Sequence, residues 1–238
     1  KDNDFFFLRR QSAAAVLSTV TELVAKRLPA SYGYSPLEDI QVLTPQRKGD
    51  LGVGALNESL QAALNPPQKG KREYKSTFAT FREGDKVLQT RNNYDIEWEK
   101  PGTGEKGMGI YNGDIGIIQR IDLVGGTMEI DFDGRRCEYT LEMAPELDLA
   151  YAVTVHKSQG SEYSAVVLPI FGGYDKLYFR NLLYTAVTRA RKLLIIVGSE
   201  SRVYQMVDNN RKMLRYTGLK WFLRQEAGKP AAESGEAE

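Results

Sequence analysis

The sequence predicts an α/β protein in which a parallel sheet covered by helices holds an inserted antiparallel β module. Two apolar runs, VVLPI at 166–170 and LLIIV at 193–197, have the composition of strands buried on both faces of a parallel sheet. Between 84 and 141 the pattern changes to short alternating strands separated by Gly-Gly and Asp-Gly turns. The parts of the chain on either side of this region look incomplete alone, so we expect an insertion rather than two consecutive domains.

The part before the module predicts alternating strands and helices. Phe5 to Leu8 is a short apolar run, typical of a strand. Apolar residues recur at three and four positions from Gln11 to Leu28, which predicts an amphipathic helix that ends at Pro29. A second strand is expected from Asp39 to Thr44, followed by the basic loop PQRKGDLGVG and a helix from Val53 to Leu64. This order outlines a phosphate-binding arrangement, although the chain has no Walker A pattern, GxxxxGK[ST].

The β module is expected to be a small antiparallel barrel of SH3 type. Its predicted strands are Gly84–Thr90, Asp114–Leu123, Thr127–Phe132 and Arg135–Leu141. Residues 98–111 are expected to form a mobile loop. Within this loop, Gly102 to Gly107 match G-x-G-x-x-G, but they follow a proline and open no apolar helix, so we interpret them as a flexible loop and not as a dinucleotide site.

The rest of the chain returns to helices and a parallel strand. A helix from Lys176 to Lys192 is expected to lead into the strand Leu193–Val197, with short helices at Ser201–Val207 and Gly218–Leu223. The tail has almost no large apolar residue and is expected to be disordered. The predicted divisions are 1–74 and 147–225 for the α/β domain, 75–146 for the β module and 226–238 for the tail.

Composition excludes several classes of protein. A hydrophobic content of 42% and a charged content of 26% are ordinary for a globular protein. Lys and Arg number 32 against 31 Asp and Glu, so an anion-binding site must be a local patch. The single cysteine, Cys137, cannot form an internal disulfide, and no Cys/His cluster predicts a metal site. We expect a cytoplasmic protein without a membrane span, since no apolar run approaches about 18 residues.

Two polar segments are candidates for ligand binding. The first has five hydrogen-bonding side chains between apolar flanks: Thr154, His156, Lys157, Ser158 and Gln159. A solvated loop is the simpler interpretation, but polar groups between buried elements need partners, and phosphate oxygens would supply them. The second segment follows an apolar helix. Arg191 and Lys192 equally fit a solvated helix end, whereas Arg189, beside Thr188, could reach a phosphate as a planar and permanently charged donor.

These segments resemble the motifs of a known family. HKSQGSE at 156–162, YTAVTRA at 184–190 and QVLTPQRKGDLGVGALNESLQ at 41–61 resemble motifs V, VI and IV of superfamily 1 helicases. The nearest branch is the RecD-like one, the exodeoxyribonuclease V alpha-subunit family, which moves 5′ to 3′ along single-stranded DNA. GDKVLQTRNNYD and YNGDIG resemble the SH3-like subdomain that this branch inserts in its second RecA-like domain. The resemblance extends from Asp4 to Gly198 and implies a RecA-like parallel sheet.

The resemblance assigns roles toward ATP with Mg²⁺. Arg189 would be the arginine finger that contacts the γ-phosphate. Arg47, or alternatively Lys48, would make the motif IV contact to the same phosphate. Gly160 and Glu162 would border the nucleotide, with the glutamate near the ribose.

The resemblance also assigns contacts to single-stranded DNA. Motif V would face the strand with Thr154, His156, Lys157 and Ser158. Further contacts from the β module would come from Asn92, Asn93 and Tyr94. Asx-type turns with a packed tyrosine explain this last group equally well.

The resemblance implies the C-terminal motor domain of an ATP-dependent 5′–3′ DNA helicase. Its partners would be single-stranded DNA, the first RecA-like domain and, in some family members, other subunits of a recombination or repair nuclease. That first domain would carry the Walker A lysine and the Mg²⁺ ligands, so we expect the chain to be a piece of a longer protein and inactive alone. The alternatives are a non-catalytic nucleic-acid clamp and a β module that docks a partner protein.

Overall fold

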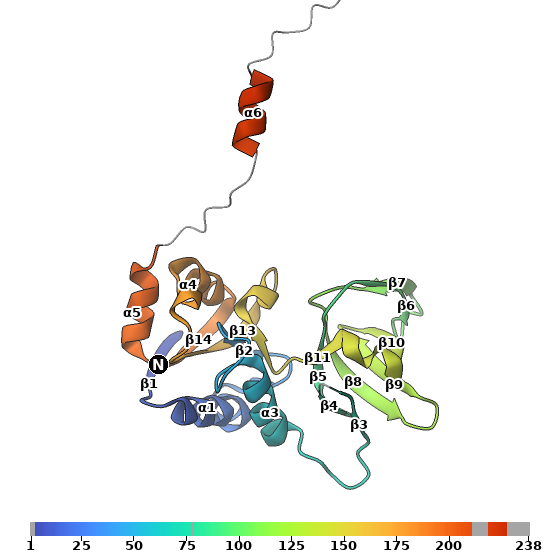
Figure 1. The fold of residues 1–238 in the computed structure, drawn as a ribbon. Helices are drawn as coiled ribbons and strands as arrows, with labels where there is room; N and C mark the ends of the chain where they lie inside the picture. Colours follow the sequence, from blue (N-terminus) through green and yellow to red (C-terminus); the bar gives the residue numbers. More distant parts are fainter. Residues whose placement is uncertain (1–2, 78, 211–218, 228–238) are drawn as a thin grey trace, which may run out of the picture.

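The structure, a computed structural model, describes residues 3–77, 79–210 and 219–227. A five-stranded sheet and a β module lie side by side (Figure 1). Every strand pair in the five-stranded sheet is parallel. In sheet order its strands are β1 (Phe5–Arg9), β14 (Ala190–Gly198), β13 (Tyr163–Ile170), β2 (Ile40–Thr44) and β12 (Ala152–Thr154). Because β1 and β2 precede the β module and the other strands follow it, the predicted insertion into an α/β fold is confirmed.

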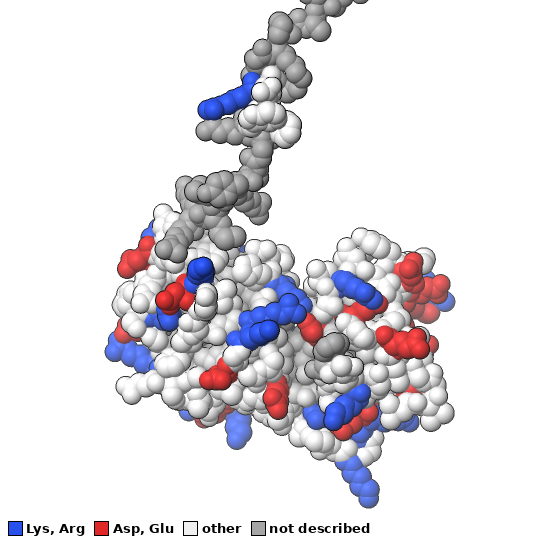
Figure 2. Space-filling view, in the orientation of Figure 1, with Lys and Arg blue, Asp and Glu red and all other residues white. Residues whose placement is uncertain are grey.

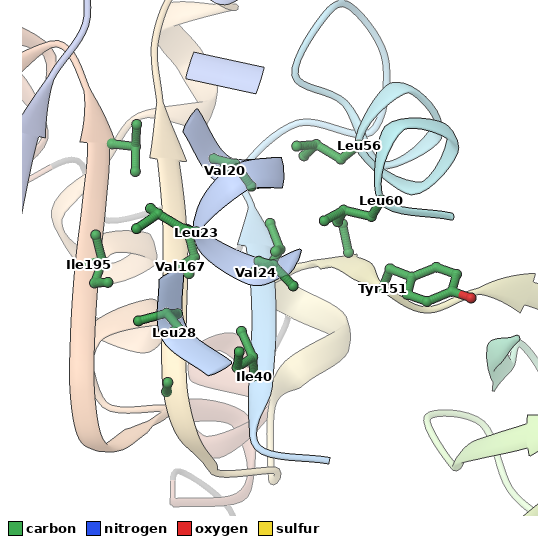
Figure 3. Close-up of a cluster of buried hydrophobic side chains, with 14 of the residues drawn as sticks. Val20, Leu23, Val24, Leu28, Ile40, Leu56, Leu60, Tyr151, Val167 and Ile195 are labelled. Carbon is green, nitrogen blue, oxygen red and sulfur yellow. The ribbon is translucent and has the colours of Figure 1, made fainter. Parts of the chain in front are cut away.

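Helices cover both faces of the parallel sheet. On one face lie α1 (Ala13–Glu22), α2 (Leu28–Tyr32) and α3 (Val53–Leu64), and on the other lie α4 (Arg180–Val187) and α5 (Glu200–Asp208). Alternate residues of each strand point to opposite faces. Val167 and Ile195 therefore pack with α1 and α3 (Figure 3), whereas Val166 and Leu194 pack with α4. The two apolar runs are thus buried on both faces, as predicted.

The first helix does not end at Pro29, as the sequence predicts, but continues to Tyr32. A π-helical turn, Leu23–Arg27, joins α1 to α2. Pro29 lies in the first turn of α2, where a missing N–H costs little. The helix stops at Gly33, whose φ of 69° is in the left-handed region and whose N–H donates to the Pro29 carbonyl oxygen at 3.0 Å.

The helix predicted from Lys176 to Lys192 is also shorter in the structure. A 3₁₀ turn, Asp175–Leu177, precedes α4, and β14 already begins at Ala190. The reason is pairing between strands, since Tyr163 lies opposite Ala190 and its N–H donates to the Arg189 carbonyl oxygen at 2.9 Å. Arg189 therefore lies in the turn between α4 and β14.

The C-terminal expectations are met in part. The two short helices are present as α5 and α6 (Leu219–Ala227). Of the tail predicted to be disordered, Glu226 and Ala227 belong to α6, and 228–238 lie outside the described residues. No helix within the described ranges has the length and apolar character needed to cross a membrane.

The β module is a curled antiparallel sheet with its own core. Its strand order is β11 (Leu147–Leu149), β5 (Lys86–Gln89), β8 (Ile115–Asp122), β9 (Thr127–Phe132), β10 (Arg135–Thr140), β6 (Asn93–Glu99) and β7 (Lys106–Ile110). A 3₁₀ segment, Leu141–Glu146, joins β10 to β11, and a separate hairpin consists of β3 (Glu73–Lys75) and β4 (Thr80–Arg82). The predicted alternation is confirmed, because Met128, Ile130 and Phe132 are fully buried.

The mobile loop predicted at 98–111 is wrong, because β6 and β7 form a hairpin there. Gly107 lies opposite Trp98, and a Cβ on Gly107 would stand 2.3 Å from the indole, so only glycine fits. Gly102 and Gly104, at φ values of 95° and 68°, lie between the two strands. The G-x-G-x-x-G pattern therefore builds a β-hairpin, and the rejection of a dinucleotide site is consistent with this.

A buried carboxylate joins the β module to the parallel sheet. Asp85 has no exposed surface and accepts hydrogen bonds from the Gln61 and Asn65 amides, each at 2.6 Å, and from the Tyr151 hydroxyl at 2.7 Å. The N–H of Arg82 donates to it at 2.6 Å. Burial raises the pKa of Asp85, although these donors act in the opposite direction. Residues from α3 and from the segment before β12 thus meet on one side chain of the module.

Replacing Asp85 by alanine is expected to lower the free energy of unfolding by at least about 3 kcal/mol. The amides of Gln61 and Asn65 and the hydroxyl of Tyr151 would lose their shared acceptor, at a cost of roughly 1 to 3 kcal/mol for each unpaired group. Urea denaturation followed by circular dichroism measures the change. Asp95→Ala, at an exposed position of β6, is the matched control and should stay within about 0.5 kcal/mol of the parent. Equal stability of the two variants would contradict the assigned role.

Next to this carboxylate lies a buried lysine. Lys86 is 3% exposed, and among the described residues the only hydrogen bond of its Nζ is to the Ile40 carbonyl oxygen, at 3.5 Å. Burial lowers the pKa of Lys86 to about 8, while the charge of Glu38 opposes the shift. The folded state therefore loses this proton at a lower pH than the unfolded chain does.

We expect Lys86→Met to stabilise the protein at pH 7 by up to roughly 3 kcal/mol, the free energy equivalent of the difference between the two pKa values. The gain should be complete below about pH 8 and shrink as the pH rises toward 10.5, where the unfolded chain also loses the proton. Thermal unfolding of parent and variant at a series of pH values tests this. An exposed control, Lys26→Met, should show no such convergence. A variant gain that is independent of pH would be inconsistent with a buried amine.

Candidate functional site

Four of the candidate residues lie at the carboxyl edge of the parallel sheet. Strand β12 pairs with β2 in parallel, with Thr154 opposite Thr44. The loop after β2 carries Arg47, which is exposed, and the 3₁₀ turn after β12 carries the exposed His156 and the half-buried Lys157. A hollow of about 620 Å³ lies between these loops. Its lining includes Arg47, Lys48, Thr154, His156 and Tyr174.

Hydrogen bonds within the turn determine which side chains face outward. Thr154 Oγ1 accepts from the N–H of Lys157 at 3.4 Å. The Ser158 hydroxyl is fully buried and donates to the Val155 carbonyl oxygen at 2.8 Å, so it holds the turn together and does not face the hollow. Lys157 Nζ lies 3.1 Å from Asp148 Oδ2. His156 and Lys157 therefore remain as the outward polar groups of this turn.

The rim opposite this turn was not predicted from the sequence. Gln46 donates to the Tyr178 hydroxyl at 2.7 Å and to the Phe171 carbonyl oxygen at 3.2 Å. Gly173, at a φ of 82°, packs so closely that a Cβ would lie 2.6 Å from Gln46 Nε2. These contacts hold Tyr174, 70% exposed, at the edge of the hollow. A Gly-Gly pair next to an aromatic residue was the available signal in the sequence.

Arg189 ties the turn after α4 to the loop before β13. Its guanidinium donates to the carbonyl oxygens of Thr185 and Ser161 and to the Thr188 hydroxyl, each at 3.1 Å. A guanidinium has five N–H donors, and within the part of the chain that the structure describes these three bonds leave two for a ligand. The side chain is half-buried, so an anion can reach it without a rearrangement of the fold.

Gly160 and Glu162 belong to the same loop. Gly160 has a φ of 88°, in the left-handed region that favours glycine. Glu162 is exposed, and its Oε2 accepts from Arg191 Nε at 2.8 Å. Because both side chains are largely solvated, this ion pair contributes little to stability and is free to exchange for a ligand.

The structure separates the residues expected to contact ATP into two groups. Gly160, Glu162 and Arg189 lie where β13 and β14 begin, whereas Arg47 follows the end of β2. The 8 residues of β13 separate these edges, which corresponds to about 23 Å at a rise of about 3.3 Å per residue. Arg47 is therefore placed with Thr154 and His156 and not with Arg189.

The asparagines and the tyrosine of the β module lie in neither group. Asn93 accepts from the N–H of Asp95 at 3.1 Å, an Asx turn. Its amide donates to Glu146 at 3.0 Å. Asn92 donates to the Tyr94 hydroxyl at 2.9 Å, and Tyr94 is 62% exposed. None of these three residues belongs to the described lining of the hollow at the carboxyl edge of the sheet.

A second, larger cleft lies between the parallel-sheet domain and the β module. Its volume is about 700 Å³, and α3, the β3–β4 hairpin and the β11–β12 segment surround it. In Figure 2, lysine and arginine side chains lie on both sides of the boundary between the parallel-sheet domain and the β module. Among the described residues no cluster of three histidine, cysteine or acidic side chains is arranged to hold a metal ion.

Comparison with known families identifies both parts of the chain. The family described as the ATP-dependent RecD-like DNA helicase SH3 domain matches residues 56–132, and the UvrD-like helicase C-terminal domain matches 149–197. The chain carries a RecD-like helicase SH3 domain and a UvrD-like helicase C-terminal domain. The expected RecD-like relationship and the RecA-like fold with an SH3-like insertion are thereby confirmed.

Two relatives named RecD2 and RecD agree with this RecD-like assignment. The ATP-dependent RecD2 DNA helicase of Deinococcus radiodurans is 38% identical over 180 residues, which are 76% of this chain and 23% of that protein. The RecBCD enzyme subunit RecD of Mycolicibacterium smegmatis is 28% identical over 79% of this chain and 30% of its own length. The chain thus spans about a quarter to a third of these relatives. The solved Pif1 helicase from Bacteroides, in complex with ADP-AlF3 and single-stranded DNA, aligns at a TM-score of 0.48 and 17% identity over 92% of this chain and 55% of that chain.

Proposed function

We propose that this chain is the second motor domain of an ATP-dependent DNA helicase that moves 5′ to 3′ on single-stranded DNA. The observation that carries the proposal is the loop from Val155 to Glu162. One end of this loop presents His156 and Lys157 at the carboxyl edge of the sheet. The other end is bonded to Arg189 through Ser161. A single short loop therefore joins a cationic surface for DNA to a guanidinium suited to a nucleotide.

On the nucleotide side, we assign Arg189 as the arginine finger and place Gly160 and Glu162 at the border of the nucleotide, with the glutamate near the ribose. ATP with Mg²⁺ would supply the phosphoanhydride bond whose hydrolysis drives movement. The two unused N–H groups of Arg189 fit a phosphate oxygen, where they would stabilise the charge that develops during phosphoryl transfer. A first RecA-like domain would supply the Walker A lysine and the Mg²⁺ ligands, since the 238 residues contain no Walker A pattern. We therefore expect this chain to be inactive without that domain.

On the DNA side, we assign Thr154, His156 and Lys157 to the phosphate backbone and bases of the strand. We also assign Arg47 to this group, because it lines the same hollow as Thr154 and His156. This differs from the role toward ATP that the resemblance implies. Ser158 would act by holding the turn.

The division of the chain follows from this proposal. Residues 1–74 and 147–225 would form the motor domain, 75–146 the SH3-like module and 226–238 a tail. Closure on ATP would move the loop that bears Arg189, and the bonded turn at Thr154 would change its grip on the strand. Assembly into a larger nuclease is a further proposal, supported by the RecBCD subunits among the relatives.

Arg189→Ala in the full-length helicase is expected to lower the DNA-stimulated ATPase rate by about 10³-fold to 10⁵-fold, as loss of an arginine finger does in comparable enzymes. Nucleotide binding should largely survive, because the first domain would hold most of the ATP. Steady-state ATPase assays and binding of a fluorescent nucleotide separate the two effects. Arg27→Ala, an exposed arginine paired with Glu22, is the control. A turnover rate equal to that of the control would disprove the assignment.

Arg47→Ala and Lys157→Ala are each expected to weaken binding of this chain to an oligodeoxythymidylate. Loss of one phosphate contact lowers the slope of log K against log salt by about 0.7 for single strands. Fluorescence anisotropy at several salt concentrations measures both affinity and slope. If Arg47→Ala left DNA affinity unchanged but weakened nucleotide binding in the full-length protein, Arg47 would belong to the ATP site instead.

A further inference from the structure

Strand β7 is a free edge of the β module. In the part of the chain that the structure describes, β7 stands at one end of the seven-stranded sheet and pairs only with β6. The N–H of Lys100 donates to the Glu105 carbonyl oxygen at 2.8 Å, so these two residues form a hydrogen-bonded pair. Bonded and non-bonded pairs alternate along an antiparallel ladder. The N–H and carbonyl groups of Lys106 and Met108 therefore point away from β6, where another strand could bind them.

A groove of about 760 Å³ lies beside this edge. Trp98 lies opposite Gly107 and packs against the core of the module. Because neighbouring residues of a strand point to opposite faces, Glu97 and Met108 lie on the outer face, which the groove follows. Met108 is 58% exposed there. An exposed methionine beside unpaired backbone groups is a surface to which another chain can bind.

The groove carries an excess of negative charge. Both of its basic side chains are already paired, since Lys106 lies 3.1 Å from Glu99 and Arg136 lies 3.3 Å from Glu129. The described lining has four acidic side chains against two basic ones: Glu97, Glu99, Glu129 and Glu138 against Lys106 and Arg136. Among the described residues, two of the carboxylates, Glu97 and Glu138, have neither an ion pair nor a hydrogen bond.

These two carboxylates lie next to each other. Cys137 of β10 is opposite Trp98 of β6, so Glu138 and Glu97 are the next pair across the antiparallel strands. Like charges that face each other across strands lower the stability of a sheet. A cationic ligand would remove this repulsion.

The groove is separate from the candidate site. In Figure 1, β7 lies apart from α3 and from the β3–β4 hairpin, and in Figure 2 acidic side chains gather at the same end of the module. A molecule bound there would leave the hollow at the sheet edge open. Because the unpaired charges are carboxylates, they repel the phosphates of a nucleic acid and favour a basic protein segment.

We propose that an extended, basic segment of a partner protein binds beside β7 as an additional strand. Its backbone would bond to the free groups of Lys106 and Met108, which is the usual mode of strand addition to a sheet edge. Basic side chains at every second position would all face the groove. Glu97 would be two strand spacings away, about 10 Å, which a lysine and a glutamate side chain span together. This proposal does not depend on the proposed helicase function.

A proline at the free edge tests the added strand. The probe is a short fluorescent peptide in which lysine alternates with valine, and its control has glutamate in place of lysine. Fluorescence anisotropy should show that the parent chain binds the lysine peptide and not the glutamate peptide. Met108→Pro should weaken binding about tenfold, because proline removes an outward N–H and leaves the bonds to β6 intact. Met108→Thr, which keeps the N–H, is the matched control, and circular dichroism checks that both variants fold.

The role of charge is tested separately. The double variant Glu97→Gln with Glu138→Gln should bind the lysine peptide about fivefold more weakly at low salt. Glu142→Gln, at an exposed position of the same module outside the groove, should bind like the parent. Hydrogen exchange of the parent should slow over residues 106–110 when the lysine peptide is bound, because free edge amides become hydrogen-bonded.

Each failure has a distinct meaning. Equal binding by Met108→Pro and Met108→Thr, with no slowing of exchange, would overturn the added strand. Equal affinity for the two peptides would overturn the basic partner. A dimer of this chain, seen by sedimentation equilibrium and dissociated by Met108→Pro, would make a second copy the occupant and would also overturn it. None of these results bears on the proposed function, since every variant should bind the oligodeoxythymidylate as the parent does.

Discussion

The arrangement of the two halves depends on one buried carboxylate. Asp85 accepts hydrogen bonds from Gln61, Asn65 and Tyr151, all of which belong to the parallel-sheet domain or its borders. A carboxyl group without exposed surface is tolerated only when hydrogen-bond partners surround it. These bonds are satisfied only when α3 and the start of β5 meet in one relative position. The position of the cleft, and of everything that lines it, follows from that geometry.

Much of the fold was predictable because burial leaves periodic signals. The runs at 166–170 and 193–197 fill strands covered on both faces, and α3 has the predicted ends, Val53 and Leu64. The predictions failed where packing between distant parts of the chain outweighed a local sequence rule. Pro29 does not end its helix because the preceding π turn shifts the hydrogen bonds, and the hairpin of β6 and β7 depends on Trp98 packing across a glycine. Neither the π turn nor the packing of Trp98 on Gly107 can be predicted from the residues next to them in the sequence.

For the candidate site, the sequence predicted which residues to consider but not how they lie relative to one another. Local motifs predicted roles for Thr154, His156 and Arg189, and the structure places each of these residues at an edge of the sheet. The sequence could not show that Ser158 points inward, since its bond to Val155 depends on a 3₁₀ turn. It also could not show that Arg47 and Arg189 lie at opposite edges, because that follows from the register of the strands between them. The cleft arises only when two segments distant in sequence pack together.

The SH3-like module returns to the parallel sheet through a short stretch of chain. Strand β11 pairs with β5, with Val87 opposite Leu149, and the N–H of Ala150 donates to the Lys86 carbonyl oxygen at 2.8 Å. Only Ala150 and Tyr151 then separate β11 from β12, the edge strand of the parallel sheet. Strands β2 and β12 are neighbours in that sheet, and α3 and the whole module lie between them in the chain. The insertion therefore lengthens one crossover connection between adjacent parallel strands and takes no place in the sheet itself.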